Sequence, residues 1–224
     1  GQAGQQPGLA QEPGRGCGLV RHHDRRRRAR STPGDDLRHR HARHQHLRQP
    51  ERADLGGGVI VTLTHPLDYL RFILGDVESL WSFNGHISPL EIDVEDSAEI
   101  GLKFSGGAVG GLHLNYFQRP PIHCLEIVGS GGTLRWDNAD GVLHLFKMPA
   151  EFGSYSANPP APVVETFAPP DGFERNQLFI VQTKHFLDVV HEKEPICSLK
   201  DGIQALQMAL AAKESQKSGR LIKL

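Results

Sequence analysis

Residues 97–117 read SAEIGLKFSGGAVGGLHLNYF. On both sides of Gly106 and Gly107, apolar side chains alternate with polar or glycine residues, which predicts two half-buried strands. The glycine pair supplies the backbone freedom that a tight hairpin turn needs. Neighbouring segments have the same strand character: VESLWSFNGHIS (77–88), HCLEIVGSGGTLRWD (123–137) with a turn at Gly131 and Gly132, and GVLHLFKM (141–148). The sequence therefore predicts an antiparallel meander of five or six strands.

Three segments around this sheet have helical periodicity. DLGGGVIVTLTHPLDYLRFILGD (54–76) spaces its apolar residues as one mostly buried helix ending at Gly75, and NQLFIVQTKHFLDVVHEKE (176–194) predicts a second helix. SLKDGIQALQMALAAKESQKSG (198–219) predicts a third, with Ser198 as its N-cap and Gly219 as its end. The predicted fold class is α+β: a large, mainly antiparallel open sheet with helices packed on one face.

The remaining segments complete this prediction. The proline-rich stretch PPAPVVETFAPPDGF (159–173) predicts an exposed loop or an edge-crossing connection, because proline cannot sit in a central strand. RLIKL (220–224) predicts a last short strand. No run of about 18 apolar residues and no apolar signal segment is found, so we expect no membrane association and a cytoplasmic location.

Composition changes abruptly near residue 51. Residues 1–50 hold eleven arginines against four acidic residues, a formal charge of +7, and contain no Phe, Tyr, Trp, Ile, Met or Lys. The other 174 residues carry −8, so the net charge of −1 is a cancellation. We predict a disordered, low-complexity basic segment over 1–50, because it has too little apolar surface to offset the entropy of ordering it. Residues 51–224 are predicted to form the folded domain.

Three interpretations of residues 1–50 stay open. Arg, Gly, Pro, His and Gln without Lys, Ile or Phe are typical of a GC-rich coding sequence read in the wrong frame. A genuine disordered tail is the second interpretation. The third is an arm in which Arg25–Arg28 neutralise nucleic-acid phosphates, or in which clustered histidines bind a metal ion. Nucleic-acid binding is kept only as this alternative.

Metal binding is not predicted for the folded part. Cys17, Cys124 and Cys197 are far apart and lack CxxC spacing, and the histidines are scattered. We expect Cys124 and Cys197 to be small buried or half-buried residues.

Taken together and in order, several segments resemble one family. DLGGGVIVTLTHPLDYLRFILGDVESL, VEDSAEIGLKFSGGAVGGLHLNYFQRPP, LEIVGSGGTLRWD and HFLDVVHEKEPICSLKDGIQALQMALAAKESQKSGRLIKL resemble the C-terminal domain of the Gfo/Idh/MocA oxidoreductases, over about residues 54–224. The resemblance implies a full-length enzyme whose separate Rossmann domain binds NAD or NADP and carries a Glu-Lys-Pro motif. Neither a strand-GxGxxG-helix unit nor Glu-Lys-Pro is found here. We therefore expect no dinucleotide to bind this chain alone.

The resemblance also implies the site residues. In the family, a histidine follows the glycines and exchanges a proton with the substrate hydroxyl, a task that suits imidazole. His65 matches it as the predicted catalytic residue. The family's aspartate is absent: counting forward from the glycines puts Thr62 at its position, and counting back four residues from His65 finds Val61. Thr62 lies three residues from His65, where it could orient the imidazole. The other predicted substrate-binding residues are Tyr116, Gln118, Arg119, Lys184 and His185.

The resemblance therefore implies that the chain is the C-terminal part of an NAD(P)-dependent oxidoreductase. Its substrate would be a hydroxyl or carbonyl of a sugar, nucleotide sugar or cyclitol, and this fragment would be inactive by itself. The resemblance implies a homo-oligomer formed through the open face of the sheet. The alternative is a non-catalytic module that binds a sugar or assembles through that face.

Overall fold

The computed structural model describes residues 52–148 and 160–224. The expected disorder of residues 1–50 lies outside this part. The described residues fall into two compact units, 52–121 with 174–224, and 122–148 with 160–173. The first unit contains η2 (Ala53–Leu55), α2 (Val59–Thr62), α3 (His65–Leu74), β1 (Val77–Gly85), β2 (Ser97–Phe104), β3 (Val109–Asn115), α4 (Asn176–Val190), α5 (Leu199–Ser218) and β8 (Ile222–Lys223). The second contains β4 (Cys124–Gly129), β5 (Gly132–Asp137), β6 (Leu143–Lys147) and β7 (Val163–Phe167).

Sheet A belongs to the first unit, and its strand order is β3-β2-β1-β8 with antiparallel pairing. The predicted hairpin at Gly106 and Gly107 is confirmed, since Lys103 pairs with Val109 across the turn and Gly107 has φ 89°. Along β2, buried and more exposed residues alternate in step with the pleat. One face of sheet A is therefore buried and the other is open.

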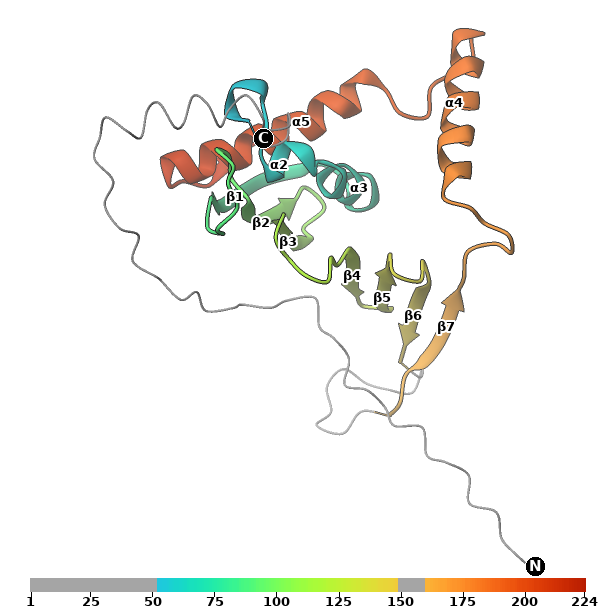
Figure 1. Cartoon of the computed structure of the whole chain (residues 1–224). Coiled ribbons are helices and arrows are strands. Elements are labelled where there is room, and N and C mark those ends of the chain that lie inside the picture. Colours follow the sequence, from blue (N-terminus) through green and yellow to red (C-terminus); the bar gives the residue numbers. More distant parts are fainter. Residues whose placement is uncertain (1–51, 149–159) are drawn as a thin grey trace, which may run out of the picture. The chain divides into compact units, whose positions relative to one another are not determined.

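The core lies between the inner face of sheet A and helices α2, α3 and α5 (Figure 1). Alanines along α5 let its backbone approach β1 closely, and Ala209 and Ala212 are fully buried. Phe104, Ile100 and Leu80 fill the sheet side of this core. Small residues on the helix thus face large ones on the strands, a combination that permits close packing.

Helix α5 has the ends that its sequence predicts. Ser198 caps it through the Asp201 amide, and the Asp201 side chain bonds back to Ser198, which forms a capping box. Gly219 closes the helix with φ 66°, a left-handed conformation that suits glycine.

The predicted single helix over residues 54–76 is divided into η2, α2 and α3. The break between α2 and α3 lies at Leu63 and Thr64. Pro66 has no N–H, so the Thr62 carbonyl loses its partner four residues on, and the first helix cannot continue through this point.

Sheet B, in the second unit, pairs β4, β5, β6 and β7 in sequence order, all antiparallel. The prediction of a loop over residues 159–173 was wrong at its centre, where Val163–Phe167 forms strand β7. This strand lies at the sheet edge, where flanking prolines are tolerated. The strands that were expected to form one large sheet thus form two four-stranded sheets within the described residues, and the predicted α+β class is confirmed.

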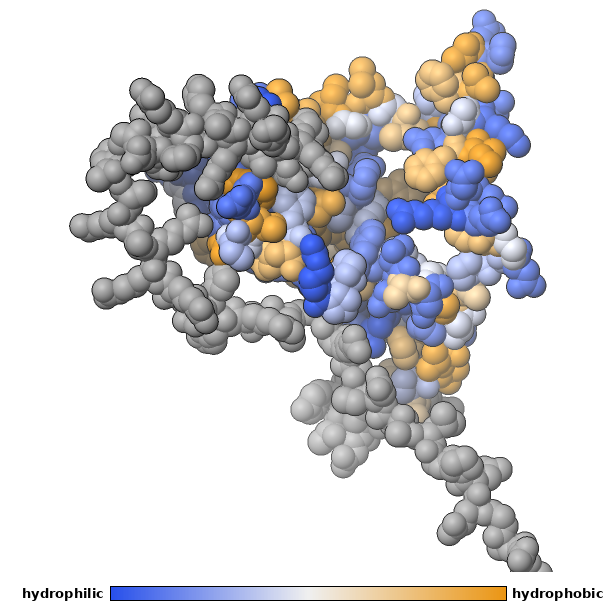
Figure 2. All heavy atoms as spheres, viewed as in Figure 1, coloured by the Kyte–Doolittle hydropathy of each residue, from blue (hydrophilic) through white to orange (hydrophobic). Residues whose placement is uncertain are grey.

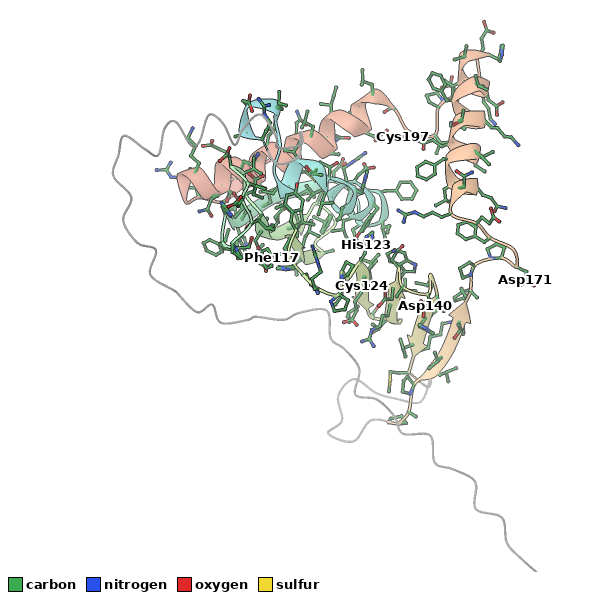
Figure 3. The ribbon with its side chains drawn as sticks, viewed as in Figure 1. Phe117, His123, Cys124, Asp140, Asp171 and Cys197 are labelled. Atoms are coloured by element: carbon green, nitrogen blue, oxygen red, sulfur yellow. The ribbon has the colours of Figure 1, made fainter. Side chains whose placement is uncertain are left out.

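Helix α4 carries exposed apolar side chains around most of its circumference, and none of its residues is buried. Figure 2 shows these hydrophobic side chains along the helix. Cys197 lies in the link from α4 to α5 (Figure 3), and its thiol is free and exposed, so the expectation of a buried or half-buried residue was wrong there.

Candidate functional site

The junction of α2 and α3 presents the predicted catalytic histidine. Val59 and Ile60 of α2 and Leu67 of α3 are fully buried. His65, the first residue of α3, and Thr62, the last of α2, are exposed. The buried anchors on both sides hold the junction, and the two polar side chains reach the surface.

Thr62 and His65 do not hydrogen-bond to each other in the described structure. The break between the helices separates them, since the spacing that brings residues three apart together applies within one continuous helix. The imidazole therefore keeps both ring nitrogens available for another molecule.

A partly buried ion pair supports the glycines that precede α2. The Glu95 side chain is only 11% exposed, and its Oε1 lies 3.1 Å from Lys213 Nζ. Lys213 also donates to the Gly57 carbonyl at 3.3 Å. Gly58 has φ 121°, and a Cβ built there would lie 2.2 Å from Glu95 Oε1. The glycines thus allow a close approach between the backbone and a carboxylate.

The segment containing Glu95 and Asp96 connects the junction with the end of β3. The Val59 amide donates to the Glu95 carbonyl at 2.9 Å, and the Tyr116 amide donates to the Asp96 carbonyl at 3.0 Å. Two adjacent carbonyls therefore hold the start of α2 and the turn after β3. This arrangement fixes two predicted site segments to one short piece of backbone.

Asp96 is fully buried and organises the loop that follows β1. Its carboxylate accepts from the amides of Ile87 at 2.9 Å and Ser88 at 3.1 Å, and from the Ser88 hydroxyl at 2.5 Å. His86 Nε2 lies 3.5 Å from the same group. A buried carboxylate needs such donors, because an unpartnered charge in the interior is costly. Sequence reasoning missed Glu95 and Asp96, although consecutive acidic residues just before a strand were a visible signal.

The turn after β3 carries three predicted substrate-binding residues. Tyr116 packs against the core, Gln118 is half-buried and Arg119 is exposed. Arg119 Nη1 donates to the carbonyls of Gln118 at 2.7 Å and Tyr116 at 3.3 Å. Its other guanidinium N–H groups remain able to donate to an anionic or hydroxyl-rich ligand.

The predicted residues on α4 have a different setting. Lys184 is exposed, and His185 Nε2 accepts from the Ile196 amide at 3.1 Å. His185 thus stabilises the turn after α4, which occupies one ring nitrogen. The structure groups Thr62 with His65, and Tyr116 with Gln118 and Arg119, while Lys184 and His185 lie on a separate helix.

A shallow groove of about 440 Å³ lies on the open face of sheet A. Trp81, Val109 and Leu221 line it above a floor that includes Gly101 and Gly111. The predicted site residues do not line this groove. It is therefore a second surface feature of the same unit.

Within the residues described, no group of three or more His, Cys, Asp or Glu side chains is arranged to hold a metal ion. No helix of the described chain has the length and apolar character needed to cross a membrane.

One family model matches part of the chain. Residues 33–135 match the family described as the GFO/IDH/MocA C-terminal domain, which confirms the resemblance inferred from the sequence. This match begins before the compositional change near residue 51. No curated protein sequence matches the chain.

Several solved structures share the fold. Levoglucosan dehydrogenase in complex with NADH and levoglucosan is 20% identical, with a TM-score of 0.66 over 80% of this chain and 53% of that one. An NAD-binding oxidoreductase from Klebsiella pneumoniae is 16% identical, with a TM-score of 0.64 over 79% and 54%. The WlbA dehydrogenase of Bordetella pertussis, in complex with NADH and UDP-GlcNAcA, is 21% identical, with a TM-score of 0.51 over 73% and 43%. This chain spans about half the length of these proteins or less.

Proposed function

We propose that this chain is the C-terminal, substrate-binding domain of an NAD(P)-dependent oxidoreductase of the GFO/IDH/MocA type. The observation that carries the proposal is the family match over residues 33–135. A fold shared over 80% of the chain with levoglucosan dehydrogenase, solved in complex with NADH and levoglucosan, supports it. Residues 51–224 are the proposed domain, and a cytoplasmic location stays a prediction.

The glycine run Gly56–Gly58 does not fit the pyrophosphate of a dinucleotide. Gly56–Gly58 precede a helix of only four residues. The space beside Gly58 is filled by the Glu95 carboxylate, which would repel a pyrophosphate. NAD or NADP, which takes up the hydride in such enzymes, would bind elsewhere in the full-length enzyme. The isolated chain is accordingly expected to catalyse no turnover.

His65 is the proposed proton-transfer residue. Its imidazole is exposed at the start of α3 and makes no hydrogen bond in the described structure. An imidazole can accept the proton of a substrate hydroxyl or return it to a carbonyl oxygen. Thr62, at the end of the preceding helix, would hydrogen-bond a neighbouring substrate hydroxyl.

The turn after β3 is the proposed orienting surface for the substrate. Gln118 supplies an amide, Tyr116 forms its apolar base, and Arg119 supplies free guanidinium donors for a carboxylate or phosphate on the ligand. Lys184 is a further proposed contact. His185 is left out, because its Nε2 already accepts from the Ile196 amide.

The proposed substrates are a sugar, a nucleotide sugar or a cyclitol. The experiment is calorimetric titration of the full chain with levoglucosan, a UDP-linked acidic sugar and myo-inositol. We expect at least one to bind, and His65→Ala to weaken that binding about tenfold, the loss of one hydrogen bond to a charged or polar group. His144→Ala, on β6, is the control that should leave affinity unchanged. Tight binding of NADH to this chain would overturn the proposed location of the cofactor.

A second candidate is a non-catalytic assembly module. The open face of sheet A favours it, because Trp81 is 43% exposed, Phe83 69% and Val109 78%. Such a face is typical of an interface between copies. Self-association without binding of any of the three compounds would favour this second candidate.

A further inference from the structure

A row of polar side chains runs from β2 across β3 into the following turn. Glu99 and His113 are directly paired residues on the open face of sheet A, and their side chains are 55% and 45% exposed. Asn115 ends β3, and Phe117 follows in the turn (Figure 3). None of the functions proposed above assigns a role to Glu99, His113 or Asn115.

The backbone fixes the orientation of the Asn115 amide. Asn115 Oδ1 accepts from the amide of Gln118 at 2.7 Å and from that of Phe117 at 3.1 Å. The Nδ2 group must therefore lie on the opposite side. There it donates one hydrogen to Gln118 Oε1 at 3.1 Å and the other to His113 Nε2 at 2.7 Å. All the hydrogens of this amide are used.

This orientation determines the tautomer of His113. Because Asn115 Nδ2 is a donor, His113 Nε2 has to be an acceptor without a proton. The proton of the neutral ring then lies on Nδ1, which donates to Glu99 Oε1. Two backbone amides of the turn thus set, through Asn115, the protonation pattern of a histidine on the preceding strand.

We propose that Glu99, His113 and Asn115 form a positioning relay that holds the turn carrying Gln118 and Arg119 in its substrate-orienting form only while His113 is neutral. A protonated imidazole donates from both nitrogens, so Nε2–H would meet Asn115 Nδ2–H. Asn115 would have to rotate its amide and release the amides of Phe117 and Gln118. The Glu99 bond would persist and gain charge assistance. The substrate-orienting role of this turn rests on the proposed function, whereas the hydrogen-bond relay does not depend on it.

The surroundings of His113 are sparsely charged. Glu99 faces it from β2, and further along β2 Lys103 is paired with Glu78 of β1 at 2.9 Å. Trp81 and Phe83 stand on the open face of β1. In the turn, Arg119 Nη1 is held by backbone carbonyls. Glu99 is thus the charged side chain that hydrogen-bonds His113 in the described structure.

Nuclear magnetic resonance of the full, ¹⁵N-labelled chain tests the relay. At pH 8 we expect imidazole ¹⁵N shifts of the Nδ1–H tautomer at His113. Between pH 8 and pH 5, the amides of Phe117 and Gln118 and the Asn115 side-chain amide should shift with the same midpoint as His113. An Nε2–H tautomer at pH 8, or turn amides that stay unchanged while His113 titrates, would overturn the proposal.

Matched variants separate the relay from simple strand packing. His113→Gln can place an acceptor near Asn115 without titrating, so the turn amides should remain in their high-pH positions down to pH 5. His113→Phe removes the acceptor, and at pH 8 the Gln118 amide should exchange with solvent about tenfold faster than in the wild type. His144→Gln should change neither result. If the amide shifts of the turn still changed with pH in His113→Gln, the relay would be contradicted. If the relay worked in a chain that binds none of the three compounds, only the proposed function would be contradicted.

Discussion

At the scale of single residues, Gly58 shows how a backbone conformation and a carboxylate depend on each other. Its φ of 121° is disfavoured for any residue with a side chain, and a Cβ would lie 2.2 Å from Glu95 Oε1. Gly56 has a φ of 72° and no atom within 4 Å of a Cβ built on it. A substitution at Gly58 therefore meets both backbone strain and steric overlap, whereas one at Gly56 meets backbone strain alone.

We expect Gly58→Ala to lower the free energy of unfolding by about 2–4 kcal/mol, because it combines both penalties. Gly56→Ala, the control, should cost about 1 kcal/mol from backbone strain alone. Urea denaturation monitored by circular dichroism measures both. Equal losses in the two variants would mean that the Glu95 carboxylate does not restrict this position.

Ser215 has a buried hydroxyl that joins α5 to β1 and to the link after α5. It is 3% exposed, accepts from the Ser82 amide at 3.0 Å and donates to the Arg220 carbonyl at 2.7 Å. Ser215→Ala would leave two backbone groups without their partner, and we expect a loss of about 1–3 kcal/mol in unfolding free energy. Ser218→Ala removes an exposed hydroxyl that bonds only to the Glu214 carbonyl of the same helix, so its effect should stay within about 0.5 kcal/mol. A comparable loss in both variants, measured by urea denaturation, would contradict the assigned role of Ser215.

At the scale of elements, the start of α5 links a helix cap to a neighbouring helix. Hydrogen bonds from the Ser198 hydroxyl and amide, followed by the Arg71 guanidinium of α3, lower the pKa of Asp201 to about 2. A carboxylate whose pKa is lower in the folded state stabilises the protein above its unfolded pKa, and this contribution is lost as the pH falls through the folded value.

Asp201→Asn should therefore be less stable than the wild type at pH 7, and the difference should shrink as the pH falls from about 4 to about 2. Unfolding free energies measured across this range in both proteins give the result. Asp188→Asn, which removes an exposed ion pair with Lys193, is the control and should show a small difference throughout. A stability difference between Asp201→Asn and the wild type that persists unchanged at pH 2 would contradict this linkage.

The elements that sequence reasoning predicted correctly are those with local signals. The β2–β3 hairpin is encoded by alternation around Gly106 and Gly107, and the ends of α5 by Ser198 and Gly219. The division of α2 from α3 was missed, because apolar spacing continues through a proline that interrupts only the hydrogen bonding. Strand β7 was missed because flanking prolines hide a short edge strand.

The candidate site was predictable to a smaller extent. His65 and the turn after β3 could be named from the resemblance, since both follow recognisable segments. The Glu95–Lys213 pair joins residues 118 positions apart in the sequence, and no local pattern reveals such a contact. The His113 relay was equally hidden, because its protonation pattern follows from the orientation of one amide in the folded turn.

At the scale of the whole molecule, two apolar surfaces remain exposed in the first unit. One is the open face of sheet A, and the other is α4, where Val181 is 64% exposed and Phe186 also 64%. An apolar surface of this kind is costly in water and is usually covered by a partner. The resemblance implies that copies of the chain meet through the sheet face. A charged substitution should therefore weaken self-association when it lies on the sheet face and not when it lies on α4.

We expect the full chain to self-associate, and the double variant Phe83→Lys with Val109→Lys to reduce its mass to that of a monomer. Two lysines on each copy would bring uncompensated positive charges together across a shared face, which disfavours association. Val181→Lys on α4 is the matched control and should leave the association unchanged. Light scattering coupled to size exclusion gives the masses, and circular dichroism checks that each variant is folded. Dissociation caused by Val181→Lys but not by the double variant would assign the interface to α4 and overturn the role of the sheet face.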